Sequence, residues 1–295
     1  MAATGEVCAL SKDKLLLFFP KEPNPEWVST IRAKYPGLQV NWASSVKEDG
    51  QPVDVNELPV EYWQGITLLF VDWAPPPAHL LSNVRFVQLA SAGADLWHNH
   101  PTYLNKDIIF SNASGVYTYV IACLKGALPG QSLMQGYPDF KSLSTGDPEG
   151  VIPSKWFHGT SKESINNFLA QDLDIVVISL PLTKDTEGLI SYKQFEIMSK
   201  NKTFLTNIAR GRHVDTQALI AALEKGQIRG AALDVTDPEP LPKEHPLWKA
   251  PNVYITPHVS WFTKKVWDRS IEILETNLER LNKNEPCINY LANRH

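Results

Sequence analysis

Short apolar segments alternate with segments of helical periodicity along most of this chain. The run 15–19 is apolar and has the length of a strand. In the segment 25–35 that follows it, Trp27, Ile31 and Tyr35 recur every four residues and would share one face of a helix. This rhythm of strand, helix and strand is typical of an α/β fold with a mostly parallel sheet.

The same rhythm predicts further elements in both halves of the chain. We expect strands at 38–42, 66–71, 86–89, 108–110, 175–178, 203–208, 231–235 and 253–256. We expect helices at 162–170, at 191–199, between Asp215 and Gly226, and at about 262–283. The segment 125–160 carries Gly and Pro every few residues and has no periodicity, so we interpret it as a loop.

Composition and charge exclude several kinds of partner. The net charge of the 295 residues is −4, so no strongly basic face is required and a nucleic-acid partner is not expected. The odd number and wide spacing of Cys8, Cys123 and Cys287 argue against a disulfide framework and favour a reducing compartment. No early segment resembles a secretory signal or a membrane span. We therefore expect a cytoplasmic protein with no membrane partner.

Three ionisable residues, Arg210, Glu239 and His258, each follow the end of a different predicted strand in the second half. Because the carboxyl ends of parallel strands line the ligand crevice of an open α/β sheet, we expect these side chains to converge. Arginine can hold a carboxylate with two hydrogen bonds. Histidine can carry a proton at neutral pH, and a neighbouring carboxylate favours its charged form. Together they suit the reduction of a 2-keto acid.

Each of these residues also has an ordinary structural explanation. An arginine after a strand is usually a solvated surface residue, and a histidine before a helix is often a cap or a hydrogen-bonding group of the core. His98 and His100 could be considered as metal ligands. Their two-residue spacing and the lack of further ligands favour a turn instead, so we expect no metal site.

Four sequence blocks carry a resemblance to a known family. They cover most of 172–260 and read DIVVISLPLTKDTEGLI, TFLTNIARGRHVDTQALIAAL, GAALDVTDPEPLPKEHPLW and PNVYITPHVS. In sequence, order and spacing they resemble the D-isomer-specific 2-hydroxyacid dehydrogenases. Upstream, VRFVQLASAGAD resembles the loop that binds the substrate carboxylate in this family. SGVYTYVIACL resembles its hinge segment, although Cys123 stands where many members carry Glu.

The resemblance implies an architecture and an activity. The fold would be α/β, with two flavodoxin-like or Rossmann-like domains. Residues 1–114 and 261–295 would form the substrate domain, and residues 115–260 would form an NAD(P)-binding domain that is incomplete. The implied activity is hydride transfer between NAD(P)H and a small 2-keto acid, which yields a D-2-hydroxy acid. The partner would then be a small molecule, and a homodimer stays open because family members are usually dimers.

The resemblance also implies roles for single residues. Arg210, Glu239 and His258 would be catalytic, and Arg210 would bind the substrate together with the backbone of Ala92 and Gly93.

On the cofactor side, Asp234 would bond the nicotinamide amide. Trp261 stands where the family usually has a small residue and would narrow the pocket. The other residues implied to contact the cofactor are Leu180, Pro181, Thr186, Ile208, Ala209, Arg210, His258 and Ser260.

One motif that the resemblance requires is missing. The family holds the pyrophosphate of the dinucleotide with a turn of the form GxGxxG between a strand and a helix. This turn belongs between Gly115 and Thr145, where Gly126, Gly130 and Gly136 have the wrong spacing, and the motif occurs nowhere else in the sequence. About 17 residues remain after the hinge, whereas a βαβ unit needs about 30 or more. We infer that the first βαβ unit is absent.

Its absence would leave the strand 175–178 at a sheet edge with part of its apolar surface uncovered. The lost burial is worth roughly 8–15 kcal/mol, which rivals the stability of a whole domain. Either another chain covers this surface, or the segment 125–160 repacks over it, or the sequence is an incomplete version of a longer protein. We favour the last explanation.

Three functions stay open at this point. The protein could be a dehydrogenase of the implied kind, with weak affinity for its dinucleotide. It could be a catalytically impaired binding or scaffold protein, since some relatives in this family act as corepressors. It could also support an intact paralogue as a dimer partner.

Overall fold

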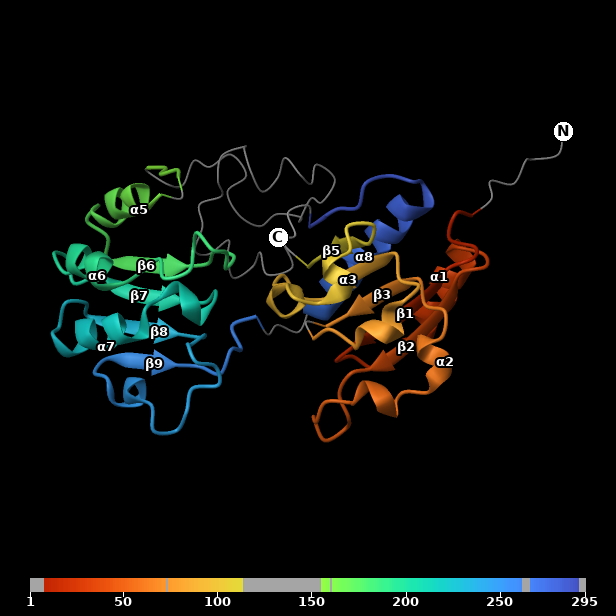
Figure 1. The fold of residues 1–295 in the computed structure, drawn as a ribbon, viewed down its shortest axis with the longest axis horizontal. Coiled ribbons are helices and arrows are strands. Elements are labelled where there is room, and N and C mark those ends of the chain that lie inside the picture. Colours follow the sequence, from red (N-terminus) through yellow and green to blue (C-terminus); the bar gives the residue numbers. More distant parts are fainter. Residues whose placement is uncertain (1–7, 73, 114–154, 160, 262–265, 292–295) are drawn as a thin grey trace. The chain divides into compact units, whose positions relative to one another are not determined.

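The computed structural model describes residues 8–72, 74–113, 155–159, 161–261 and 266–291 (Figure 1). These residues form two compact units. The first unit contains the described residues within 8–113 together with 266–291, and the second contains those within 155–261.

The first unit is built on a five-stranded sheet in which all neighbouring strands are parallel. The strand order is β2-β1-β3-β4-β5. The strands are β1 (Lys14–Phe19), β2 (Gln39–Ser44), β3 (Leu68–Val71), β4 (Phe86–Leu89) and β5 (Ile109–Ser111). Every residue of β3 and β4 is buried, as expected for a parallel sheet that is covered on both faces.

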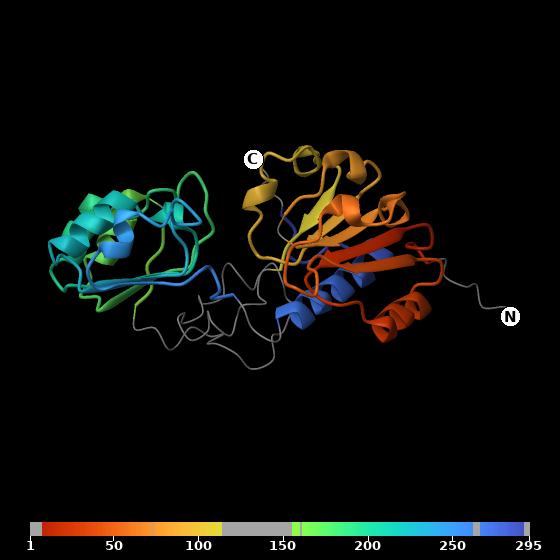
Figure 2. The same cartoon turned by 90° about the horizontal axis from the view of Figure 1, so that it is seen from below.

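Helices cover both faces of this sheet. The helices α1 (Pro25–Lys34) and α8 (Val266–Asn282) lie on one face, and α2 (Val60–Trp63) and α3 (Pro101–Leu104) lie on the other (Figure 2). The long helix α8 packs through an apolar stripe that includes Ile271, Leu274 and Leu278, all of them buried. The C-terminal helix therefore completes the core of the first unit.

The second unit contains a four-stranded parallel sheet with the order β6-β7-β8-β9. The strands are β6 (Ile175–Ile178), β7 (Phe204–Asn207), β8 (Gly230–Leu233) and β9 (Val253–Ile255). The helices are α5 (Lys162–Leu169), α6 (Tyr192–Met198) and α7 (Thr216–Glu224). Ser161 and Asp215 accept hydrogen bonds from the first turns of α5 and α7, which explains where these helices begin.

The two faces of the second sheet differ in their cover. Val176, Leu205 and Leu233 point to the face on which α5, α6 and α7 pack, and they are buried. The opposite face carries Ile175 of β6 and Tyr254 of β9, whose side chains are 57% and 69% exposed. A parallel sheet is ordinarily buried on both faces, so this asymmetry is unusual.

The predicted α/β class with parallel sheets is confirmed. Each strand and helix predicted within the described residues is present, with ends shifted by a few residues. The short helices α2 and α3 were not predicted, because a helix of four residues shows no periodicity. Among the described strands, β6 is an edge strand, as predicted. The domain boundaries at 114–115 and 260–261 stay a prediction.

Several predictions lie outside the described residues. They concern Cys123, the hinge segment, most of the loop 125–160 and the interval in which the Gly-rich turn belongs. None of the helices that the structure describes is both long enough and apolar enough to cross a membrane.

The unequal cover of the second sheet can be tested with neighbouring substitutions on β6. We expect Val176→Thr to lower the free energy of unfolding by about 1–3 kcal/mol, because it buries a hydroxyl in the helix-covered core. We expect Ile175→Thr to change it by less than about 0.5 kcal/mol, because this side chain is largely exposed. Urea unfolding measures both. Equal losses would mean that the Ile175 face is covered in solution.

Candidate active site

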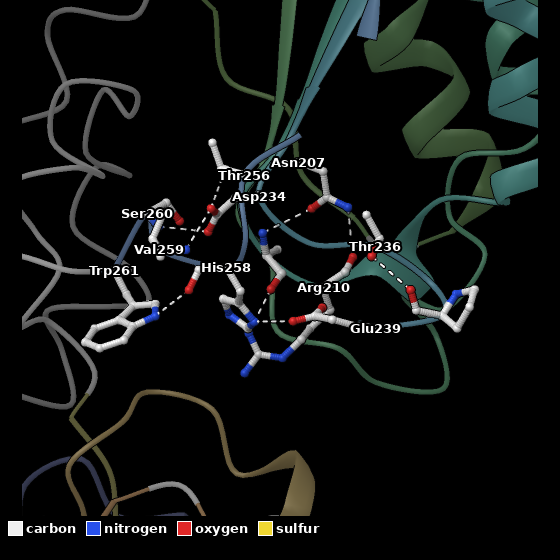
Figure 3. Close-up of polar contacts among 12 residues, drawn as sticks. Asn207, Arg210, Asp234, Thr236, Glu239, Thr256, His258, Val259, Ser260 and Trp261 are labelled. Carbon is white, nitrogen blue, oxygen red and sulfur yellow. Dashed lines mark hydrogen bonds and ion pairs between the residues drawn. The ribbon is translucent and has the colours of Figure 1, made fainter. Parts of the chain in front are cut away.

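Most of the residues singled out by the sequence lie on loops at the carboxyl edge of the second sheet. Arg210 follows β7, Asp234 and Glu239 follow β8, and His258 follows β9. Because β7, β8 and β9 are adjacent and parallel, their loops leave the sheet at the same edge (Figure 3).

His258 and Glu239 form the central pair of this edge. Nδ1 of His258 lies 2.6 Å from Oε1 of Glu239, and the two side chains are 24% and 37% exposed. Arg210 extends from its own turn toward the same two side chains (Figure 3). The carboxylate fixes the orientation of the imidazole through Nδ1, so proton exchange with a bound molecule falls to Nε2.

The backbone at His258 has an unusual conformation. Its φ angle is +55°, in the left-handed region that a residue with a side chain adopts at a cost of roughly 1–2 kcal/mol. Two hydrogen bonds to the backbone of His258 hold it there. The N–H of His258 donates to the carbonyl oxygen of Asp234 at 2.9 Å, and its carbonyl oxygen accepts from Nε1 of Trp261 at 2.6 Å.

Asp234 holds the loop that carries His258. Asp234 is only 5% exposed, and its carboxylate accepts hydrogen bonds from three residues (Figure 3). They come from Oγ1 of Thr256 at 2.5 Å and from the backbone N–H groups of Val259 and Ser260 at 2.8 and 2.9 Å. Burial by itself raises the pKa of Asp234, but the hydrogen bonds from Ser260, Thr256 and Val259 outweigh it and lower this pKa below its usual value.

The resemblance implied contacts from Asp234 and Ser260 to the cofactor. In the structure both carboxylate oxygens of Asp234 accept hydrogen bonds from the protein's own loop, and the backbone N–H of Ser260 is one of the donors. The observed contacts of these two residues are therefore internal to the site.

Arg210 lies on a tight turn after β7. The buried side chain of Asn207 accepts a hydrogen bond from the N–H of Ala209 at 3.0 Å and donates to the carbonyl oxygen of Arg210 at 2.8 Å. Gly211 then approaches the backbone of the loop after β8, where an added Cβ would lie 2.0 Å from the carbonyl oxygen of Thr236. Only glycine permits this approach, which brings the Arg210 turn against the neighbouring loop.

The loop after β6 is tied to the Arg210 turn by a fully buried histidine, His213. Its Nδ1 lies 2.8 Å from the carbonyl oxygen of Thr186, and its Nε2 lies 3.0 Å from the carbonyl oxygen of Leu180. The hydroxyl of Thr186 donates to the carbonyl oxygen of Pro181 at 2.8 Å. The loop after β6 is therefore held by its own hydrogen bonds at the same edge of the sheet, and it contains Leu180, Pro181 and Thr186.

Ile208 and Ala209 join β7 to the turn of Arg210. The N–H of Ile208 donates to the carbonyl oxygen of Ile178 at 3.2 Å, which extends the pairing of β6 and β7 by one residue. The carbonyl oxygen of Ala209 accepts from Nη1 of Arg210 at 2.7 Å. Both residues thus lie between the loop after β6 and the Arg210 turn.

The backbone of Ala92 and Gly93 belongs to the first unit, on the loop after β4. Oγ of Ser91 donates to the carbonyl oxygen of Gly93 at 2.8 Å, and Nδ2 of Asn112 donates to the carbonyl oxygen of Ala92 at 2.8 Å. These bonds fix the carbonyl groups of the loop and leave its N–H groups as the candidates for a ligand carboxylate.

His98 and His100 belong to a turn of the first unit. Nδ1 of His100 accepts a hydrogen bond from the N–H of Thr102 at 3.3 Å and caps α3, and burial lowers the pKa of His100. In the part of the chain that the structure describes, no group of three or more His, Cys, Asp or Glu side chains could hold a metal ion.

Two residues that position the site were missed by the sequence reasoning. Asn207 is a polar residue at the end of an otherwise buried strand, and this position was the one signal that could have indicated its role. His213 follows Arg210 by three residues, but nothing in the sequence distinguishes a buried histidine from an exposed one.

Parts of the chain are similar to known proteins. A family model described as "D-isomer specific 2-hydroxyacid dehydrogenase, NAD binding domain" matches residues 151–260. A glyoxylate reductase from Thermofilum pendens is 43% identical over 139 residues, which are 47% of this chain and 39% of that protein. A glyoxylate/hydroxypyruvate reductase A from Photorhabdus laumondii is 37% identical over 129 residues, which are 44% of this chain and 39% of that protein. The chain thus spans well under half the length of these two relatives.

The fold is also similar to that of solved structures. A D-isomer specific 2-hydroxyacid dehydrogenase from Xanthobacter autotrophicus, crystallised with NADPH and MES, has a TM-score of 0.64 and 25% sequence identity. That comparison covers 95% of this chain and 98% of the other.

The role of Asp234 in holding the loop leads to a prediction about stability and pH. We expect Asp234→Asn to lower the free energy of unfolding near pH 7 by about 1–3 kcal/mol, because the amide cannot accept all three hydrogen bonds. Since the pKa of Asp234 is lowered by folding, its contribution is present above the unfolded value of about 3.9 and is lost as the pH falls through the folded value. The difference in free energy of unfolding between wild type and variant should therefore become smaller as the pH falls.

Urea unfolding at a series of pH values measures this gap. Asp185→Asn, a change at an exposed position of the second unit, serves as the control and should show no such dependence. A gap that is constant between pH 7 and pH 3 would contradict the role given to Asp234.

Proposed function

We propose that the protein reduces a small 2-keto acid to a 2-hydroxy acid, because residues 151–260 match the family model of the NAD binding domain of D-isomer specific 2-hydroxyacid dehydrogenases. The observation that carries the proposal is the 2.6 Å contact between His258 and Glu239, on loops beside the Arg210 turn. The similarity to reductases of glyoxylate and hydroxypyruvate supports a substrate with two or three carbons.

Arg210 would bind the carboxylate and the ketone oxygen of the substrate. Its guanidinium offers several N–H donors in one plane, which suits two oxygens on adjacent carbons. The Asn207 contacts to its turn hold the backbone from which this side chain extends, so the guanidinium is presented from a rigid element.

His258 would supply the proton of the reaction. When hydride reaches the keto carbon, the electron pair of the C=O bond moves to oxygen, and Nε2 of His258 transfers its proton to that oxygen. The products are the 2-hydroxy acid, a neutral imidazole and the oxidised form of the dinucleotide that would donate the hydride. Glu239 stabilises the charged imidazole before the transfer and keeps Nε2 directed at the substrate.

The loops at this edge suit the nicotinamide end of a dinucleotide, and bound NADH or NADPH would supply the hydride. Leu180 and Pro181 are exposed on the loop after β6, and the half-buried Ile208 follows the neighbouring strand β7. They offer an apolar surface for a flat ring. The hydrogen bonds of His213 and Thr186 hold this surface in place.

The sequence offers no comparable binding site for the pyrophosphate of the dinucleotide. In this kind of fold, a GxGxxG turn binds phosphates with its backbone N–H groups and the N-terminus of the helix that follows. No GxGxxG motif occurs in the sequence, so this chain has no such turn. We therefore propose that the chain binds the nicotinamide end of the cofactor and gains little binding free energy from the adenylate half.

Arg210→Ala tests the proposed reaction. With glyoxylate or hydroxypyruvate and NADH, we expect kcat/KM to fall by at least about 100-fold, because the substrate loses charge-assisted hydrogen bonds to both oxygens. Arg212→Ala is the matched control, since Arg212 is on the same turn but is exposed and pairs with Glu187 at 3.2 Å. Equal effects of the two substitutions, or an unchanged kcat/KM in Arg210→Ala, would refute the role of Arg210.

The weak hold on the adenylate half can be measured directly by calorimetry. We expect NADH to bind with a dissociation constant near the millimolar range, which corresponds to about −4 kcal/mol. Reduced nicotinamide mononucleotide, which lacks the adenylate half, should bind about equally well. Micromolar affinity for NADH, with much weaker binding of the mononucleotide, would show that the chain does hold the pyrophosphate.

A second candidate is a binding protein without turnover, and the missing Gly-rich turn favours it. Both functions use Arg210 to hold a carboxylate, so binding of glyoxylate does not separate them. Turnover does: a wild-type protein that binds glyoxylate but oxidises no NADH at saturating cofactor would be a binding protein.

A further inference from the structure

Trp261 follows the loop that carries His258, and its side chain turns back onto that loop. Nε1 of the indole donates a hydrogen bond of 2.6 Å to the carbonyl oxygen of His258 (Figure 3). We propose that Trp261 is a positioning residue that fixes the backbone of His258 for proton transfer. This inference rests on the proposed function, because it names a further residue of the same site.

The backbone of His258 needs such support. Its φ of +55° is uncommon for a residue with a side chain, and conformations of this kind persist where the surroundings hold them. On the amino side, the peptide is held by the bond from the N–H of His258 to the carbonyl oxygen of Asp234. On the carboxyl side, the next two N–H groups are bound by the Asp234 carboxylate. The indole of Trp261 binds the carbonyl oxygen between these two anchors.

The direction of the imidazole depends on this peptide. Figure 3 shows Trp261 and Glu239 on opposite sides of His258. Glu239 holds the ring at Nδ1, and Trp261 holds the backbone from which the ring extends. If either Glu239 or Trp261 is replaced, the other still holds His258. The direction of Nε2 is then less well fixed, because only one of the two contacts restrains the residue. Catalysis is sensitive to such changes, since a displacement of about 1 Å can lower a rate about 100-fold.

The indole also occupies space beside His258. The resemblance implied that Trp261 narrows the pocket, and this expectation is tested together with the positioning role. A substrate with a small side chain, such as glyoxylate, would be favoured over a bulky one, such as phenylpyruvate.

Trp261→Phe removes the donor and keeps most of the ring. The matched control is Trp248→Phe, because Trp248 lies in the same unit and its Nε1 also donates to a backbone carbonyl, that of Pro242, at 2.9 Å. With glyoxylate and NADH, we expect Trp261→Phe to lower kcat about 10-fold with KM changed less than about 2-fold, and Trp248→Phe to change neither. Trp261→Ala should in addition raise the ratio of kcat/KM for phenylpyruvate to that for glyoxylate.

A second readout does not depend on turnover. In protein labelled with ¹⁵N-histidine, the signals of His258 are assigned by their loss in His258→Gln. We expect the ring nitrogen signals of His258 to move in Trp261→Phe and to stay in place in Trp248→Phe.

The two readouts separate this proposal from the proposed function. If the wild-type protein shows no turnover, the proposed function fails, and the His258 signals alone decide whether Trp261 positions the ring. If kcat and the His258 signals are unchanged in Trp261→Phe, the positioning role is overturned, whatever the activity of the wild type.

Discussion

The parallel pairing of β7, β8 and β9 is the constraint on which the candidate site depends. In-register neighbours run from Asn207 to Leu233 and from Leu233 to Ile255, so the three strands end at the same level of the sheet. Each loop therefore starts within one strand spacing of the next, about 4.8 Å away. Because of this, Glu239 and His258 can meet although 19 residues separate them in sequence.

Within this frame, the buried carboxylate of Asp234 organises the loop of His258. A carboxylate that is removed from water must be hydrogen-bonded, and the donors available to it are Thr256, Val259 and Ser260. These donors can reach it only if the chain reverses sharply between Thr256 and Val259, and the left-handed backbone of His258 makes that reversal. The need to satisfy one buried charge thus accounts for the unusual conformation of a residue proposed to be catalytic.

Much of this could be predicted from the sequence, and the limit has a physical cause. Apolar runs and helical periodicity report burial, so the strands and longer helices were predicted, and with them the edge to which Arg210 and His258 belong. The partners of Asp234, His213 and Trp261 could not be predicted in this way. They depend on single φ angles and on contacts between different loops, which leave no periodic signal in the sequence.

The inferred absence of the first βαβ unit would explain both the exposed side chain of Ile175 and the missing Gly-rich turn. In a doubly wound sheet, the first βαβ unit supplies both the phosphate-binding turn and structure beside and over the strands that follow it. A chain without that unit would leave Ile175 of the edge strand β6 exposed, as it is in the structure, and would have no GxGxxG turn to bind a pyrophosphate. The edge formed by β7, β8 and β9 is held by hydrogen bonds within 178–261, among them the contact of His258 with Glu239 and the bond from Trp261 to His258. Under the proposed function, such a chain keeps the geometry for acid catalysis and has little affinity for the adenylate half of the dinucleotide.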